Sequence, residues 1–208
     1  MLDNEEQQQV EQIKKWFSEN GLFLAISLVV AIIALFAYQY WNQITEKDTA
    51  QASEQYELLL DDLANNKIAN AQEVGSAILT QHKNSTYASL AALLMANEAV
   101  QEKHYELAQS YLQKVIKEGH VAALREIARL RLARLQIENG KPEVALNLLN
   151  DIDEKQYIPA VDAIRGDAYV ALKKYDLAKG SYQQALIKLP DDAIFHTLVA
   201  MKLNDLPN

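Results

Sequence analysis

Histidines and carboxylates are the side chains in this sequence whose types could support catalysis or metal binding. The histidines form neither an H-x3-H pair nor an H-E-x-x-H motif; they are His82, His104, His120 and His196. The chain has no cysteine, which excludes thiol catalysis, thiolate metal sites and a disulfide framework. No glycine-rich loop is present to hold a phosphate group. We therefore expect a protein that is not an enzyme and that holds no cofactor or metal.

Two pairs of adjacent carboxylates have positions that helix structure explains without catalysis. Asp61 and Asp62 lie near the expected end of a helix, and Asp191 and Asp192 precede a segment with helical periodicity. Negative charge is stabilising at a helix N-terminus, so the second pair is predicted to cap a final helix over residues 193–203.

Composition limits the classes of partner. The chain has 208 residues and a formal net charge of −8, so no basic patch is expected that would neutralise the phosphates of a nucleic acid. The same acidic balance argues against adhesion to anionic lipid beyond a membrane anchor. Glycine and proline are sparse, at six and four residues, and alanine and leucine are abundant, which favours a helical protein.

Residues 21–41 carry no charge and are almost entirely apolar. A helix needs about 20 residues to cross a hydrocarbon core of about 30 Å, and this segment has that length. It ends in the bulky Tyr40 and Trp41 without a small-residue cleavage site, so we interpret it as an uncleaved anchor rather than a signal peptide. Trp16 and Phe17 precede it, which places aromatic rings at both expected interfaces with the lipid.

The anchor divides the chain into a short tail, residues 1–20, and a large domain, residues 42–208. Lys14 and Lys15 flank the start of the anchor, and Lys47 is the nearest basic residue after it. The positive-inside rule therefore predicts a cytoplasmic tail and a domain on the opposite side of the membrane. The dipeptide Asn20-Gly21 predicts a helix break before the span.

From residue 49 almost to the end, the spacing of apolar residues is helical. One predicted helical face carries Ala52, Tyr56, Leu59, Leu60 and Leu63. No segment shows sustained alternation of apolar and polar residues, so no strand is expected. The predicted fold class is all-α.

A short internal repeat indicates the architecture of the large domain. The segments Lys103–Ala108 and Lys173–Ala178 align without gaps, and a third copy of the turn ends at Ala145. The alanines of the three copies lie 37 and 33 residues apart, close to the period of about 34 residues in tetratricopeptide repeats. We predict a solenoid of three such repeats, preceded by a degenerate helix pair and closed by a capping helix.

The last repeat has the fullest packing pattern. Small residues at Gly166 and Ala178 are predicted to let paired helices approach, while Tyr169 and Tyr182 fill the space between neighbouring pairs. The other repeats depart from this pattern and retain mainly their alanines. The predicted packing residues are Ala108, Ala145, Gly166, Tyr169, Ala178 and Tyr182.

Several segments together resemble the YfgM family, ancillary subunits of the SecYEG translocon in the inner membrane of Gram-negative bacteria. These segments are Lys14-Lys15-Trp16-Phe17, Glu19-Asn20-Gly21, Tyr40-Trp41-Asn42, Leu130–Arg134 and the ending Met201–Leu206. The resemblance implies a periplasmic repeat domain beside the translocon, working with PpiD, a membrane-anchored periplasmic chaperone, to help exported proteins leave the channel. It carries over no catalytic residue.

In tetratricopeptide arrays the first helix of each repeat lines the concave face, and the resemblance places a protein-binding groove there. The groove residues that it implies are Leu90, Leu94, Asn97, Ile127, Arg131, Arg134 and Asp167. An alternative remains open, in which Leu93, Leu130 and Ile137 are core residues and the two arginines are solvated or pair with Glu126 or Glu138.

A second function is compatible with the same architecture. A membrane-anchored repeat adaptor for cytochrome maturation, cell-division coordination or other envelope machinery would need the same anchor and solenoid. The sequence also leaves open whether exported clients bind directly or only through a partner chaperone.

Overall fold

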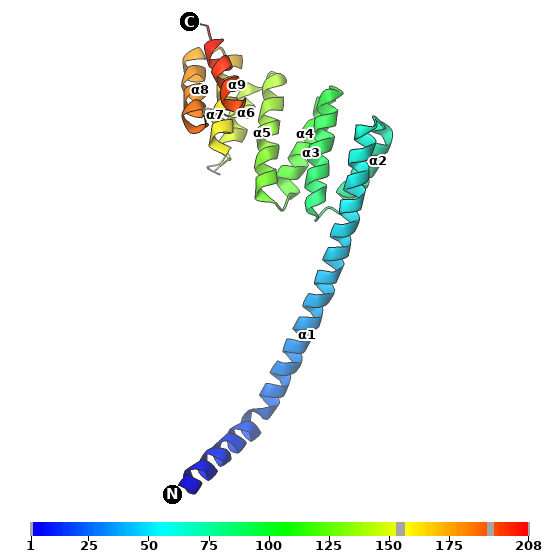
Figure 1. Ribbon diagram of the computed structural model, residues 1–208, viewed down its shortest axis with the longest axis vertical. Coiled ribbons are helices and arrows are strands. Elements are labelled where there is room, and N and C mark those ends of the chain that lie inside the picture. The colour runs from blue at the N-terminus through cyan, green and yellow to red at the C-terminus, as the bar shows by residue number, and fades with distance from the viewer. Residues whose placement is uncertain (1, 153–156, 191–193, 208) are drawn as a thin grey trace. The chain divides into compact units, whose positions relative to one another are not determined.

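The computed structural model describes residues 2–152, 157–190 and 194–207, which form helices and connecting turns without a strand (Figure 1). The helices of these residues are α1 (Leu2–Ala64), α2 (Ile68–Gln81), α3 (Thr86–Gln101), α4 (Tyr105–Glu118), α5 (Ala122–Glu138), α6 (Pro142–Asn150), α7 (Ile158–Ala171), α8 (Tyr175–Lys188) and α9 (Ile194–Asn204). The all-α prediction is confirmed. The predicted cap at Asp191 and Asp192 lies outside the described residues.

Helix α1 is continuous through Asn20 and Gly21, so the predicted break there is wrong. The Asn20 side chain donates a hydrogen bond to the backbone carbonyl of Trp16 at 3.0 Å, and Thr45 Oγ1 donates to the carbonyl of Trp41 at 3.0 Å. Side chains that bond back to the preceding turn satisfy their own polar groups and leave the helical backbone intact.

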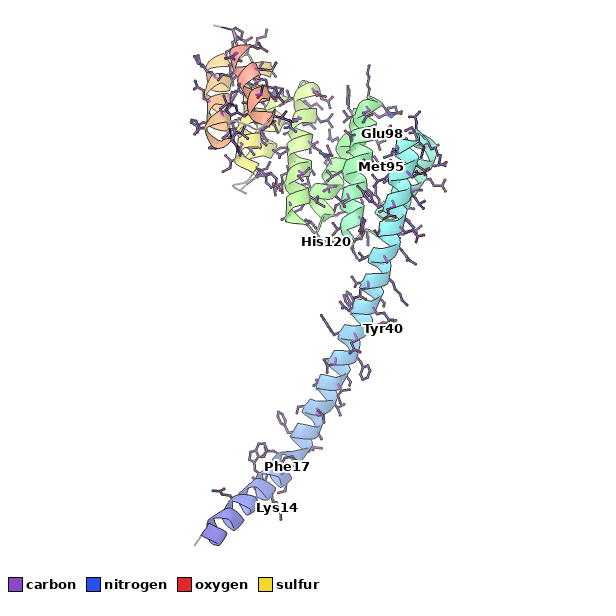
Figure 2. The ribbon with its side chains drawn as sticks, in the orientation of Figure 1. Lys14, Phe17, Tyr40, Met95, Glu98 and His120 are labelled. Carbon is purple, nitrogen blue, oxygen red and sulfur yellow. The ribbon has the colours of Figure 1, made fainter. Side chains whose placement is uncertain are left out.

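The chain divides into two compact units, Met1–Asp48 and Thr49–Asn208. In the described residues one helix is long and apolar enough to cross a membrane, and none of its most apolar stretch is buried inside the protein. Figure 2 labels Phe17, which precedes that stretch, and Tyr40, which lies further along the same helix, and both are exposed. The first unit fits a membrane anchor with interfacial aromatic residues.

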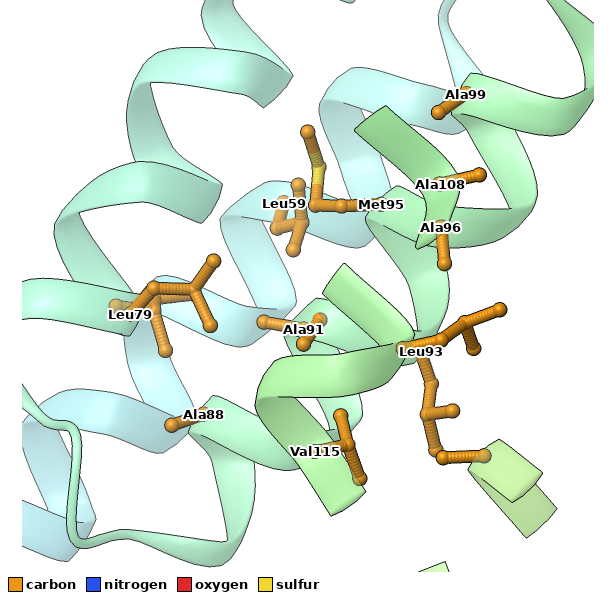
Figure 3. Packing of buried hydrophobic residues seen from close by; sticks show 14 of the residues in the cluster. Leu59, Leu79, Ala88, Ala91, Leu93, Met95, Ala96, Ala99, Ala108 and Val115 are labelled. Atoms are coloured by element: carbon orange, nitrogen blue, oxygen red, sulfur yellow. The ribbon is translucent and has the colours of Figure 1, made fainter. Parts of the chain in front are cut away.

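The second unit is a row of antiparallel helix pairs (Figure 1). Helix α3 pairs with α4, α5 with α6, and α7 with α8, while α9 packs against α8. The end of α1 shares a core cluster with α2, through Leu59, Ala71 and Ile78. Small and large apolar side chains lie side by side in the core, as Figure 3 shows for Ala91, Ala96 and Ala108 near Leu59 and Met95, which are all buried. Close helix contacts in this unit therefore combine alanines with larger apolar residues.

Four equivalent turns connect the helices of the pairs. Each contains a residue in the left-handed region, namely Asn66 at φ 58°, Lys103 at 61°, Gly140 at 71° and Lys173 at 58°. In each turn the next backbone N–H donates a bond of 2.7 or 2.8 Å to a carbonyl five residues earlier, which closes the preceding helix. The degenerate first pair therefore folds as a hairpin of the same kind as the three predicted repeats.

The alanines of the predicted packing set are completely buried. Ala108, Ala145 and Ala178 stand at the same position of α4, α6 and α8, five residues after the left-handed residue of their turn. Gly166 of α7 and Tyr182 of α8 are in direct contact, since a Cβ atom at residue 166 would overlap Cε1 of Tyr182. Tyr169 is half-buried and packs against the cluster that contains Tyr182.

We predict that Lys173→Gly raises the free energy of unfolding by about 0.5–1 kcal/mol. A left-handed conformation costs an ordinary L-residue about 1–2 kcal/mol, and glycine avoids this cost but loses part of the gain through its more flexible unfolded chain. The matched control is Lys174→Gly, because Lys174 has φ −95° and carries no such strain. Urea unfolding of the full chain in detergent should give a higher midpoint for the first variant and a lower midpoint for the control.

We also predict that Gly166→Ala lowers the free energy of unfolding by about 1–3 kcal/mol, because the added methyl group must push Tyr182 and α8 away. Gly180→Ala is the matched control. Gly180 lies inside α8, and a Cβ atom there would meet nothing within 4 Å, so alanine should stabilise the helix by about 1 kcal/mol. Equal midpoints for the two variants would refute the close-packing assignment.

Candidate functional site

A hollow of about 260 Å³ opens between α3 and α5. Its lining residues are Ala96, Asn97, Val100, Leu112, Arg131, Arg134, Leu135 and Glu138. Alanine, valine and leucine supply an apolar floor, and Asn97, Glu138 and the arginines supply a polar wall. Of the groove residues implied by resemblance, the structure thus brings Asn97, Arg131 and Arg134 to one site.

The apolar groove residues lie elsewhere. Leu94 and Ile127 are half-buried and pack against the largest core cluster, and Leu90 is also half-buried. The alternative assignment of Leu93 and Leu130 to the core agrees with the structure, because both are buried. Ile137 is half-buried against a second core cluster. These side chains mainly hold the repeats together.

Helical periodicity places the two arginines on one face of α5. Leu132 and Leu135, on another face, are buried in the core, whereas Arg131 and Arg134 are exposed and three residues apart. Arg131 Nη1 crosses to α3 and donates a hydrogen bond to the carbonyl oxygen of Leu93 at 3.1 Å. This bond fixes the Arg131 side chain along the edge of the hollow.

Neither arginine pairs with the acidic residues considered for it. Glu126 forms its ion pair with Arg129. Arg134 makes no hydrogen bond or ion pair within residues 2–152, 157–190 and 194–207, although Glu138 lies one turn further along the same helix. The second guanidinium of the hollow is therefore without a direct partner in this part of the chain.

The pKa of Arg134 is lower than that of a free guanidinium. The first cause is desolvation by surrounding protein atoms, although part of the side chain reaches solvent; the positive charge of Arg131 acts in the same direction. The negative charge of Asp167 acts in the opposite direction. Arginine still remains protonated at neutral pH, so the hollow carries two adjacent positive charges.

The structure places Asp167 at the junction of α7, α8 and α9. Its Oδ1 accepts a hydrogen bond of 2.7 Å from the hydroxyl of Tyr182, and both carboxylate oxygens accept from Lys202 Nζ at 2.8 Å. Burial, followed by this hydrogen bond and the charge of Asp167, raises the pKa of Tyr182. Asp167 thus links α9 to α7 and α8 through these bonds, and its negative charge also interacts with Arg134.

Sequence reasoning missed Lys202 and the floor of the hollow. Lys202 lies 35 residues after Asp167, and no local pattern connects two residues so far apart. Leu112 and Leu135 have the spacing of ordinary core residues, so nothing in the sequence separates them from the rest of the core. The described residues contain no group of three or more histidine, aspartate or glutamate side chains that could hold a metal ion.

Comparison with known proteins gives a consistent result. The tetratricopeptide repeat-like domain family matches residues 14–208. A protein of Aggregatibacter actinomycetemcomitans named ancillary SecYEG translocon subunit is 31% identical over 97% of this chain and 98% of its own length. Proteins of the same name from Haemophilus influenzae and Escherichia coli are each 27% identical over 97% of this chain, and over 98% and 96% of their own lengths. No solved structure matches the chain.

The similarity extends from the anchor to the last helix, and the repeat pattern, the apolar helix and the absence of strands from the described residues agree with it. The chain therefore belongs to the YfgM family, whose repeat region is a tetratricopeptide repeat-like domain.

Proposed function

We propose that this protein is an ancillary subunit of the SecYEG translocon and acts as a membrane-anchored scaffold for protein interactions. The observation that carries the proposal is the near full-length similarity to proteins from several bacteria that bear this name. The apolar helix of the first unit supplies an anchor, which keeps the second unit close to a membrane-embedded partner.

The repeat domain supports a scaffold rather than a catalyst. Its hollow between α3 and α5 has an apolar floor and two guanidinium groups, which are features of protein-binding surfaces. Among the described histidines, His104 is exposed in the turn before α4, with its Nδ1 3.9 Å from a Glu102 carboxylate oxygen. His82 is buried at the end of α2, so neither faces the hollow between α3 and α5.

The finer proposal concerns topology and partners. The tail with Lys14 and Lys15 lies in the cytoplasm, and the repeat domain lies in the periplasm of a bacterium with two membranes. There the domain works with a PpiD-like membrane-anchored chaperone and assists newly exported polypeptides. Lys14 and Lys15 support the orientation, and the resemblance to the YfgM family supports the choice of chaperone.

We predict that translocon subunits and a PpiD-like chaperone co-purify with the full chain from gently solubilised membranes, through a tag at its carboxyl terminus. The control is an unrelated single-span protein with the same tag and a similar expression level. Enrichment of another envelope machine, such as one for cytochrome maturation or cell division, with translocon subunits at the control level would overturn the proposal and favour the adaptor function.

A second prediction tests the topology with single cysteines, since the chain has none of its own. Lys179→Cys lies at an exposed position of α8, and Gln9→Cys lies at an exposed position of the tail. In cells with a permeabilised outer membrane, a membrane-impermeant maleimide should label the first variant and not the second. Both should be labelled after the inner membrane is dissolved, and the reverse pattern would refute the orientation.

A further inference from the structure

We propose that two copies of this protein associate in the membrane through the outer face of α9, the last helix of the row (Figure 1). The inference rests on the proposed membrane anchor and does not depend on the translocon as partner. It is carried by three apolar side chains that α9 leaves uncovered, which we call the α9 stripe: Ile194, Leu198 and Met201.

Helix α9 is apolar on two faces. Phe195, Val199 and Leu203 belong to the core cluster that α9 shares with α8. The stripe residues follow one another at spacings of four and three, so they lie in line on another face, and they are 91, 47 and 58% exposed in chain order. The terminal helix of a solenoid needs a polar outer face, and a helix that is apolar all round is buried on every side. The outer face of α9 therefore has the character of a contact surface.

The charges around the α9 stripe suit a second copy of the same surface. Residues 194–201 contain no aspartate, glutamate, lysine or arginine. Lys202 donates to both carboxylate oxygens of Asp167 at 2.8 Å, so its charge is neutralised within the chain. Spacings of four and three residues are those of the contact positions in a two-stranded coiled coil, where each residue packs beside its equivalent. A two-fold contact between identical surfaces is also the commonest form of oligomer.

The order of the helices indicates how two copies would meet. Helix α9 runs in the same sense as α3, α5 and α7, the first helices of the pairs (Figure 1). Each second unit begins at Thr49, directly after the anchor segment, so two copies in one membrane bring their α9 helices together in parallel. The N–H of Asp205 donates to the carbonyl of Met201 at 3.0 Å, which continues the helical turn and puts Asp205 next in line with the stripe. In the parallel contact the two Asp205 carboxylates lie side by side and repel each other.

The size of the α9 stripe makes the contact weak. A standard stable interface engages about 20–30 residues and about 800 Å² on each partner. Three side chains on each copy, with a like-charge pair at one end, do not hold two copies together in dilute solution. Confinement of both anchors to one membrane raises their effective concentration and offsets this weakness. We therefore expect dimers in membranes that separate when the protein is diluted in detergent.

The test is disulfide formation by single cysteines in the full chain, which has none of its own. In the parallel contact, Met201→Cys brings two equivalent thiols within reach of a disulfide, so mild oxidation of native membranes should give a covalent product of twice the chain mass. Asn147→Cys is the matched control, at an exposed position of α6. It should give about tenfold less product, and dilution in detergent before oxidation should abolish the product of Met201→Cys.

A substitution at the centre of the α9 stripe tests whether the contact needs apolar residues. Leu198→Lys in the Met201→Cys chain should lower the yield by about tenfold or more, because it places two positive charges side by side. Asn147→Lys in the same chain makes the same change in net charge on α6 and should leave the yield unchanged. Circular dichroism and the melting temperature should be the same for both variants.

A charge exchange identifies the second copy as the occupant. Two differently tagged Met201→Cys chains are produced in one membrane, and one of them also carries Asp205→Lys. Opposite charges then lie side by side only in the mixed pair, so the mixed product should exceed the sum of the two like-charged products, which random pairing would equal. Random pairing, equal yields for Met201→Cys and Asn147→Cys, or a product that contains a different protein would each overturn the inference.

The disulfide and the co-purification fail independently of each other. Translocon subunits that co-purify normally, together with no product above the Asn147→Cys control, would refute this inference alone. A covalent dimer that depends on Leu198 and Asp205, with no translocon recovered, would support the α9 contact and refute the proposed function.

Discussion

The close approach of two helices within each pair is the constraint on which the repeat domain depends. In each pair, the first helix has a buried residue seven positions before the left-handed turn residue. The second helix has a buried residue nine positions after that turn residue. The pairs at these two positions are Leu59 with Gly75, Ala96 with Leu112, Ala133 with Leu149, and Gly166 with Tyr182. In the last pair Gly166 meets Tyr182 of its own partner helix, whereas the space beside Gly75 is filled by Met95 of α3. Small residues therefore allow close approach both within a pair and between neighbouring pairs.

The different neighbours of these two glycines explain how far the sequence predicted the fold. Gly166 and Tyr182 match the known repeat pattern, so the last pair was identified directly. In the first pair the large residue is Leu59 and the small one is Gly75, which inverts the pattern and hides the repeat from a position-by-position comparison. The turn at Asn66 and the buried Ala71, 37 residues before Ala108, show that the geometry is nevertheless the same. The residue that fills the space beside a small side chain can come from another helix pair, as Met95 does for Gly75, and a comparison of positions within one repeat does not reveal it.

The anchor is the opposite case. The composition of the segment predicts the apolar helix correctly, whereas the turn signal at Asn20-Gly21 predicts a helix break that the structure does not have. Hydropathy over residues 21–41 indicated the apolar helix because length and lack of charge are properties of the segment itself. Asn20 and Gly21 suggested a break, but the Asn20 side chain bonds to the carbonyl of Trp16 inside a continuous helix. A residue that favours turns can remain helical when its side chain finds an acceptor on the preceding turn.

The candidate site follows from how the repeats distribute their charges. The resemblance to tetratricopeptide repeats was sufficient to predict that Arg131 and Arg134 lie on the open face of α5, and both are exposed in the structure. It could not show which cations are already paired, since Lys202 reaches Asp167 only through the packing of α9. The last repeat also holds Asp162 between Arg165 and Lys188, at 2.9 and 2.7 Å. The domain thus pairs its charges internally in the last repeat, whereas the guanidinium of Arg134 stays unpaired beside the apolar residues of the hollow between α3 and α5. Such a surface is suited to a partner. The contrast between the two regions is visible only in three dimensions.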